Sequence, residues 1–254
     1  MMLPAPAYDD GRVTLYQGDC RELLPLVLER HGRPAHVFTD PPYTKRTHEG
    51  ARTLRGGGDP KELIDFANAE IDFVREVFAA ARPQRWTVAS VDHVHATLLQ
   101  LSPPEGMRHV RTGVWIKPDC APQMNGKHPA NGHESIAILH THEPMRWNGG
   151  GERAVWTHNV ERSIDWHTTP KPLGLIARLV RDFTDENELL LDMFAGSATT
   201  LAAAMQEGRR AVGIELDVHP KTVERLTRAA QQVPMWKPHT EKRRTAVLDF
   251  GGDS

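Results

Sequence analysis

The 254-residue chain has few of the features that mark extracellular, metal-bound or membrane-spanning proteins. It holds two cysteines, Cys20 and Cys120, too few for a disulfide framework or a four-thiolate zinc site. No apolar run reaches the roughly 18 residues of a membrane span, and no signal-peptide core stands near the start. The formal net charge is −2, so no global basic field attracts nucleic acid. These absences predict a cytoplasmic protein that needs a local basic patch to bind a polyanion.

Two motifs of cofactor and metal chemistry are also missing from the chain. It has no G-x-G-x-x-G dinucleotide fingerprint, which argues against a pyrophosphate-bearing cofactor. Its 14 histidines include no H-E-x-x-H pair and no histidine at a metal-ligand spacing from a cysteine. We therefore expect no metal site.

Short apolar runs alternate with amphipathic segments along the chain. Strands are expected at residues 13–16, 36–39, 86–91, 110–116, 135–139, 189–191 and 211–214, and helices at 21–29, 60–81, 92–101, 173–183, 197–207 and 220–232. This alternation predicts an α/β fold built on a doubly wound, mostly parallel sheet of seven strands. One domain is expected over residues 12–232, between a flexible lead and a loosely ordered tail at 233–254.

A strand, turn and helix near Asp192 suggest a nucleotide site. The apolar strand ends at Asp192, and the chain then passes through Gly196 into an alanine-rich helix that Ser197 can cap. The next apolar strand ends at Glu215, where a carboxylate can accept hydrogen bonds from both ribose hydroxyls. With a single glycine in the turn, a nucleoside cofactor without phosphates fits better than a dinucleotide. An ordinary strand–turn–helix connection is the alternative.

The segment Asp40-Pro41-Pro42-Tyr43 follows the strand at 36–39. Its two prolines fix the main chain, so the Asp40 carboxylate and the Pro41 carbonyl can point at one spot. Together they can accept both hydrogens of an exocyclic amino group, while the Tyr43 ring can stack on a planar base. The alternative is a tight turn with a half-buried tyrosine. Two nucleotide features in one chain favour the binding site.

These residues resemble the S-adenosylmethionine-dependent DNA amino-methyltransferases of the permuted β class, in which an Asp-Pro-Pro-Tyr motif precedes the cofactor motifs. One position departs from the family pattern, because Ala198 stands where the second glycine of the cofactor turn is expected. The likeness spans roughly residues 13–228. After Asp40-Pro41-Pro42-Tyr43, the matching segments are His167-Thr168-Thr169-Pro170-Lys171-Pro172 (H-x-T-x-K-P), residues 192–200 (D-x-F-x-G-S-G-T-T), Gly213-Ile214-Glu215 (G-I-E), Gly18-Asp19-Cys20 (G-D-C) and Trp115-Ile116-Lys117-Pro118 (W-x-K-P).

The resemblance implies a circularly permuted, Rossmann-like methyltransferase that methylates the amino nitrogen of a base flipped out of double-stranded DNA. Residues 140–165 would form a small target-recognition insert. The basic loop with Lys45, Arg46, Arg52 and Arg55 would clamp DNA phosphates, unless it is a plain solvated loop. The implied catalytic residues are Asp40, Pro41, Pro42 and Tyr43. The implied cofactor-binding residues are Asp19, Cys20, Asp40, His167, Thr168, Thr169, Lys171, Asp192, Phe194, Ala195, Gly196, Ser197, Ala198, Thr199, Thr200, Glu215 and Leu216.

Adenine N6 is the favoured target, because the Asp form of the catalytic motif goes with adenine more often in this family, whereas Ser replaces it in many cytosine-N4 enzymes. Cytosine N4 stays open, as do RNA or protein methylation and a non-catalytic nucleic-acid-binding relative. A nicotinamide oxidoreductase on the same type of sheet is the rival from another class. No Pro-Cys pair is present for methylation at ring carbon five of cytosine. A bacterial or phage host, a restriction–modification setting and a homodimer are compatible with the family, and a nuclease partner is unknown.

Overall fold

The computed structural model describes residues 2–41, 60–122, 124, 126–142, 144–164, 166 and 170–232, without the side chains of residues 60–70. Several predictions fall outside the described residues: the catalytic Pro42 and Tyr43, the basic loop with Lys45, Arg46, Arg52 and Arg55, the cofactor residues His167, Thr168 and Thr169, and the tail at 233–254.

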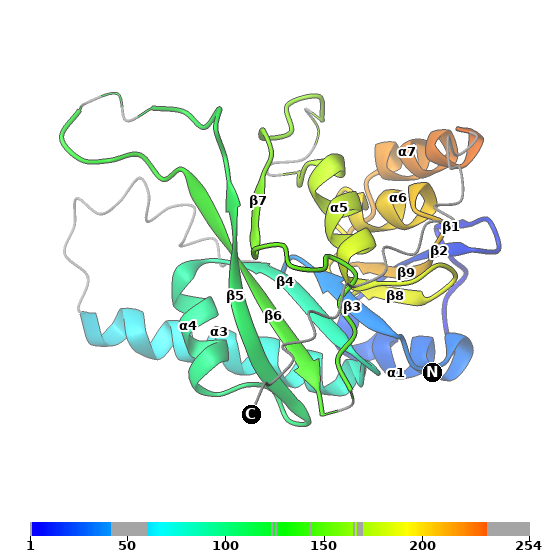
Figure 1. The fold of residues 1–254 in the computed structure, drawn as a ribbon. Coiled ribbons are helices and arrows are strands. Elements are labelled where there is room, and N and C mark those ends of the chain that lie inside the picture. The colour runs from blue at the N-terminus through cyan, green and yellow to red at the C-terminus, as the bar shows by residue number, and fades with distance from the viewer. Residues whose placement is uncertain are drawn as a thin grey trace, which may run out of the picture.

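A nine-stranded sheet forms the middle layer of the described structure (Figure 1). The five strands at its centre run parallel to one another, whereas β1 is antiparallel to β2, β6 is antiparallel to β4 and β5, and β7 is parallel to β5. The doubly wound, mostly parallel sheet is confirmed, but it has nine strands rather than seven. Their order across the sheet is β1 (Tyr8–Asp9), β2 (Val13–Gln17), β9 (Arg210–Glu215), β8 (Leu189–Asp192), β3 (His36–Thr39), β4 (Trp86–Val91), β6 (His133–Thr141), β5 (Met107–Ile116) and β7 (Val155–Thr157).

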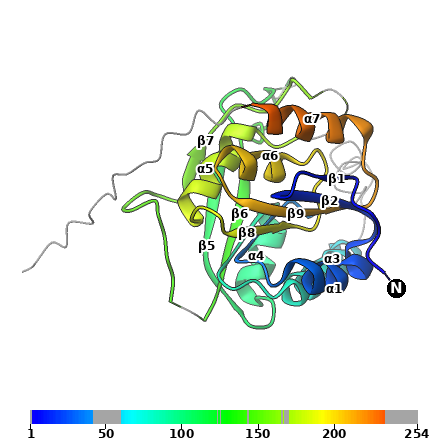
Figure 2. The same cartoon turned by 90° about the vertical axis from the view of Figure 1, so that its right-hand side faces the viewer.

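Helices cover both faces of the sheet, as the view in Figure 2 shows. One face carries α1 (Cys20–His31), α3 (Pro60–Ala81) and α4 (His93–Leu101), and the other carries α5 (Leu173–Phe183), α6 (Thr199–Gln206) and α7 (Pro220–Gln231). Successive strand residues point to opposite faces, so Val37 packs into the core on the first side and Phe38 into the core on the second. Within the described ranges, no helix is long and apolar enough to span a membrane.

The two strands that the sequence pattern does not predict are the edge strands β1 and β7. Residues before 12 were expected to be a flexible lead, but Tyr8 and Asp9 pair with Leu15 and Thr14 of β2. β7 lies in a segment without periodicity, yet it pairs with β5 and buries Trp156 to 5% exposure. Strands of two and three residues are too short to show an alternating pattern, which explains why both were missed.

Two tryptophans tie part of the segment 140–165 to the body of the protein. The rings of Trp147 and Trp156 lie 4.7 and 6.3 Å from the ring of Phe183 at the end of α5. The Trp156 indole N–H also donates to the buried Asp182 carboxylate, at 3.2 Å. These contacts make the region around β7 part of the hydrophobic core. A target-recognition role for residues 140–165 stays a prediction.

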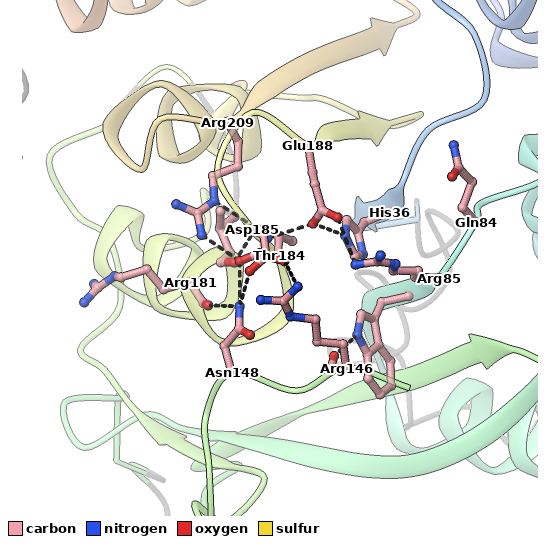
Figure 3. A network of polar contacts seen from close by, with 12 residues as sticks. His36, Gln84, Arg85, Arg146, Asn148, Arg181, Thr184, Asp185, Glu188 and Arg209 are labelled. Atoms are coloured by element: carbon pink, nitrogen blue, oxygen red, sulfur yellow. Dashed lines mark hydrogen bonds and ion pairs between the residues drawn. The ribbon is translucent and has the colours of Figure 1, made fainter. Parts of the chain in front are cut away.

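A polar network joins the amino-terminal ends of β3, β4 and β8 (Figure 3). The Glu188 carboxylate, just before β8, contacts His36 Nε2 at 2.8 Å and the Arg85 guanidinium at 2.9 Å, and accepts the Asp185 backbone N–H at 2.7 Å. Burial alone would raise the pKa of Glu188, but these partners outweigh burial and hold that pKa at about 2. The network therefore fastens three strands together at the end opposite to their carboxyl termini.

The two halves of the chain meet at the centre of the sheet, where β3 lies beside β8. From β8 the chain crosses over through α6 to β9, and from β3 it crosses over through α3 to β4, on the opposite side. A sheet with this divergence binds ligands in the crevice at the carboxyl ends of the two central strands. Asp40 directly follows β3 and Asp192 ends β8, so both lie at this crevice.

Candidate active site

A cavity of about 670 Å³ opens at the carboxyl ends of β2, β9, β8 and β3. Each of these strands contributes one carboxylate to its wall, from Asp19, Glu215, Asp192 and Asp40 respectively. The volume lies within the roughly 300–1,000 Å³ of small-molecule sites. Of the predicted site residues, the wall brings together Asp19, Cys20, Asp40, Pro41, Lys171, Asp192, Phe194, Ala195, Gly196, Ser197, Thr199, Thr200, Glu215 and Leu216.

Asp192 is the most deeply buried of these carboxylates, at 3% exposure. Its Oδ1 accepts hydrogen bonds from the Thr39 hydroxyl at 2.8 Å and from the Phe194 backbone N–H at 3.1 Å. Burial raises the pKa of Asp192 to about 6, a rise that the Thr200 and Thr39 hydroxyls oppose and the Asp40 charge assists. A carboxylate in such surroundings is stabilised by a cation, so the cavity favours a ligand with a positive group near Asp192.

Asp19 caps the amino terminus of α1 and is held by its neighbour Arg21. Its Oδ1 accepts the Arg21 backbone N–H at 2.8 Å and the Arg21 Nε–H at 3.0 Å, and these hydrogen bonds lower the pKa of Asp19. The Arg21 guanidinium lies 5.8 Å from the centre of the Phe73 ring, which in turn meets the Phe194 ring edge-on at 6.0 Å. The cavity thus has an aromatic side beside the Asp19–Arg21 pair. Burial raises the pKa of Cys20 to about 11, so its thiol is neutral at pH 7.

The turn from β8 into α6 is braced from α7. The Gly196 backbone N–H donates to Glu215 Oε2 at 2.5 Å. From α7, the Arg225 guanidinium donates to the Ser197 carbonyl at 2.6 Å and to the Thr199 hydroxyl at 3.0 Å. Burial lowers the pKa of Arg225. This half-buried cation fixes the carbonyl and hydroxyl of the turn from behind, leaving the other side of the turn to the cavity.

Ala198 occupies a backbone conformation that L-residues rarely adopt. Its φ is 57° and its ψ is 36°, in the left-handed region where glycine is at ease, and its side chain is fully buried. The prediction that Ser197 caps α6 is wrong: the helix begins at Thr199, Ala198 is its N-cap, and no side chain caps it. The Ser197 hydroxyl instead contacts the Thr199 hydroxyl and Arg225, at 3.2 Å each.

A row of alternating charges leads away from Asp40. Lys171 Nζ lies 2.6 Å from Asp40 Oδ2 and 3.0 Å from Glu134 Oε1, and Lys117 Nζ lies 2.8 Å from Glu134 Oε2. Burial alone would raise the pKa of Glu134, but the two ammonium groups outweigh it and lower that pKa. Likewise, burial would lower the pKa of Lys171, but Asp40 and Glu134 raise it. Glu134 and Lys171 are therefore both charged at neutral pH despite their burial.

Sequence reasoning missed several residues of this site, among them Arg21, Phe73, Glu134 and Arg225. Glu134 had a usable signal, since it is the one carboxylate of a strand whose middle, residues 136–139, is apolar. Arg225 and Phe73 lie on helices whose amphipathic pattern explains them without a site, so only the packing shows where they point. Lys171 was predicted to bind the cofactor, and this stays a prediction: the residue lines the cavity, and its ammonium pairs with Asp40.

The charges of the wall favour a phosphate-free ligand. The two cations of the wall, Arg21 and Lys171, are paired with Asp19 and Asp40. Among the described residues, Asp192 and Glu215 therefore have no cation in the wall to neutralise them, and both face the ligand. A phosphate would meet net negative charge here. A nucleoside that carries a positive group meets the complementary sign.

Known proteins resemble this chain in sequence. Residues 35–223 match the DNA methylase family of N6 and N4 methyltransferases. The type II methyltransferase M2.LlaDCHI of Lactococcus lactis subsp. cremoris is 26% identical, over 85% of this chain and 88% of its own length. M2.DpnII of Streptococcus pneumoniae is 23% identical, over 85% of this chain and 90% of its own.

Two solved structures extend the comparison. A putative DNA modification methylase from Thermus thermophilus, solved in complex with S-adenosyl-L-methionine, is 25% identical with a TM-score of 0.59, covering 87% of this chain and 95% of that one. The PvuII DNA methyltransferase, described as cytosine-N4-specific, superposes with a TM-score of 0.67 over 93% of this chain and 90% of that one. At 16% identity, the second likeness shows the shared fold alone.

Proposed function

We propose, from the premise that this chain belongs to the DNA methylase family of N6 and N4 methyltransferases, that its cavity binds S-adenosylmethionine and that Asp40 directs methyl transfer to an exocyclic amino group of DNA. The observation that carries the proposal is the meeting of Asp40 with the buried acid Asp192 in one cavity, at the carboxyl ends of adjacent parallel strands. Family membership also sets the nicotinamide oxidoreductase hypothesis aside.

The residues present fit the cofactor. S-adenosylmethionine has an α-ammonium group, two ribose hydroxyls and an adenine amino group, and it carries no phosphate. Asp192 would hold the ammonium, Glu215 the ribose hydroxyls and Asp19 the adenine amino group, with Phe194 and Phe73 beside the ring. When bound, the cofactor supplies a methyl group on a positively charged sulfur, which leaves as a neutral thioether.

The protein's own contribution to the transfer is placement of the amino nitrogen. The Asp40 carboxylate and the Pro41 carbonyl would accept the two N–H bonds, so that the nitrogen lone pair faces the methyl carbon in line with the C–S bond. As the N–C bond forms and positive charge develops on nitrogen, the Asp40 carboxylate stabilises it and takes the proton that leaves. No general acid is needed, because the leaving sulfur is neutral.

Adenine N6 is the base position that we assign to this site. The support is the Asp form of the Asp40-Pro41-Pro42-Tyr43 motif, which the family uses more often for adenine. Stacking of the flipped base on Tyr43 and phosphate contacts from Lys45, Arg46, Arg52 and Arg55 belong to the same proposal, and these residues lie outside the described part of the chain.

The test is transfer of a labelled methyl group from S-adenosylmethionine to unmethylated double-stranded DNA, followed by digestion to nucleosides. Label in N6-methyladenine is expected from the wild type and not from Asp40→Ala. Asp72→Ala is the matched control, because Asp72 is 71% exposed on α3, where its partner is Arg75. Label in N4-methylcytosine alone would refute the adenine assignment. No label in DNA, with cofactor still bound, would refute the choice of acceptor.

A further inference from the structure

We infer that Glu134 is a positioning residue for the methyl transfer, because it holds the Lys171 ammonium against the Asp40 carboxylate. Glu134 touches neither of the groups that react and acts through Lys171. The inference rests on the proposed function, since it assigns a task to Asp40 in that reaction. It adds a residue from β6, on the far side of β4 from Asp40, to the machinery of the site.

Three separate parts of the fold bring these groups together. Asp40 follows β3, Lys171 lies just before α5, and Glu134 is the second residue of β6. The Lys171 ammonium is the only bridge between the two carboxylates among the described residues, at 2.6 Å from Asp40 Oδ2 and 3.0 Å from Glu134 Oε1. The side chains of Lys171 and Glu134 are 10% and 16% exposed, so water does little to screen this contact.

Glu134 is itself fixed from the other side. Its Oε2 accepts a hydrogen bond from Lys117 at 2.8 Å, and the Lys117 ammonium also lies 4.4 Å from the ring of Trp115. Trp115 is the cross-strand neighbour of Glu134 in the β5–β6 pair. The carboxylate therefore has a fixed location in the sheet, which a flexible four-carbon lysine chain such as Lys171 lacks on its own.

Sharing the ammonium between two carboxylates changes what Asp40 can do. If Lys171 had Asp40 as its sole anion, the whole of its charge would draw electron density from the carboxylate that must accept the target N–H and stabilise the developing charge. With Glu134 opposite, Lys171 orients Asp40 while a second carboxylate balances part of the ammonium charge. Loss of Glu134 should thus weaken both the placement and the acceptor strength of Asp40, without altering the walls formed by Asp192 and Glu215.

The experiment compares Glu134→Gln with wild type in the full-length protein. We expect the single-turnover rate of methyl transfer, at saturating cofactor and DNA, to fall about 10- to 100-fold, because small misplacements of reacting groups lower rates by such factors. The dissociation constant for S-adenosylmethionine, measured by calorimetry, should stay within about twofold. Glu152→Gln is the matched control, because Glu152 is 55% exposed and pairs with Arg178 on the surface at 3.7 Å.

Two further measurements separate positioning from a general loss of structure. In the double variant Glu134→Gln/Lys171→Met, transfer should be no slower than in Lys171→Met alone, because Glu134 acts through Lys171. In protein labelled with ¹⁵N-lysine, the Lys171 ammonium held by two carboxylates should give a slowly exchanging NMR signal that is lost in Glu134→Gln and in Asp40→Asn.

The outcomes are distinct. An unchanged transfer rate in Glu134→Gln, multiplicative losses in the double variant, or a cofactor affinity that falls in step with the rate would each overturn the inference. If the wild-type protein transfers no methyl group, the proposed function and the role of Glu134 in it are both overturned. If the Lys171 ammonium signal is unchanged in Glu134→Gln, the positioning contact alone is overturned.

Discussion

Replacing Asp192 by asparagine tests the electrostatics of the cavity floor. Asp192 is 3% exposed, and burial raises its pKa from 3.8 to about 6. Because its folded-state pKa lies above the unfolded value, the folded protein holds this proton more tightly, and stability is lost as pH rises through the interval between the two. At about 1.4 kcal/mol per unit, a shift of about two units makes ionised Asp192 cost the folded state about 3 kcal/mol.

The asparagine side chain in the variant Asp192→Asn would keep an oxygen for the Thr39 hydroxyl and the Phe194 N–H but would carry no charge. The variant's stability relative to wild type should therefore rise by about 3 kcal/mol between about pH 4 and pH 8, whatever the offset at low pH. Urea denaturation of both proteins across this range gives the difference, in which the other titrating groups cancel. The exposed Asp72→Asn should show a flat difference.

The same substitution should abolish the preference for a positively charged ligand. Calorimetry with S-adenosylmethionine should show weaker binding to Asp192→Asn, and wild-type affinity should increase as pH rises through about 6, with proton release on binding. A stability difference that does not change with pH would refute the claim that Asp192 is a desolvated carboxylate, and with it the reason for placing a cationic group there.

Three further predictions concern parts of the structure away from the reacting atoms. Glu188→Gln should lower the free energy of unfolding by about 2 kcal/mol at pH 7. Since the pKa of Glu188 in the folded protein is depressed, wild type should lose this contribution as pH falls from about 4.5 toward 2. Methyl transfer per folded molecule should not change. Ala198→Gly should alter the free energy of unfolding by less than about 1 kcal/mol, because relief of the left-handed conformation offsets the lost methyl group and the greater freedom of the unfolded chain. Ala203→Gly is the comparison, since Ala203 is equally buried but lies inside α6; it should cost about 2 kcal/mol in urea denaturation. Arg225→Met should weaken S-adenosylmethionine binding about tenfold in calorimetry, because the Ser197 carbonyl and Thr199 hydroxyl lose their charged donor; unchanged affinity would show that the turn holds its shape without α7.

The sheet was largely predictable because its central strands carry strong apolar runs. β3 and β4 begin and end at the residues expected from the sequence, and the carboxylates at strand ends marked the cavity before any contact was known. The edge strands β1 and β7 were not predicted, since their stability comes from pairing with β2 and β5 rather than from their own sequence pattern.

The contacts inside the site were the harder part to predict. The motifs predict that Asp40 and Lys171 belong to the cavity, but not that they pair with each other, because a sequence pattern does not give the distance between their side chains. The sequence could mark Glu134 as an unusual carboxylate in a strand, but its pairing with Lys171 and Lys117 was visible only in the structure. The left-handed backbone at Ala198 was equally hidden, since alanine at that position gives no sign of a positive φ.

The pairing of β3 with β8 also sets a delay in folding while the chain is being synthesised. Thr39 and Asp192, which meet across this pair, are 153 residues apart. At roughly 5–20 residues per second of synthesis, β3 waits about 8–30 s for its partner strand to be made. Throughout that interval, β3 exposes at least one unpaired edge, a template for pairing with other chains. Crowded expression should therefore trap incomplete chains as aggregates, and slower induction or a chaperone that covers strand edges should raise the yield of soluble enzyme.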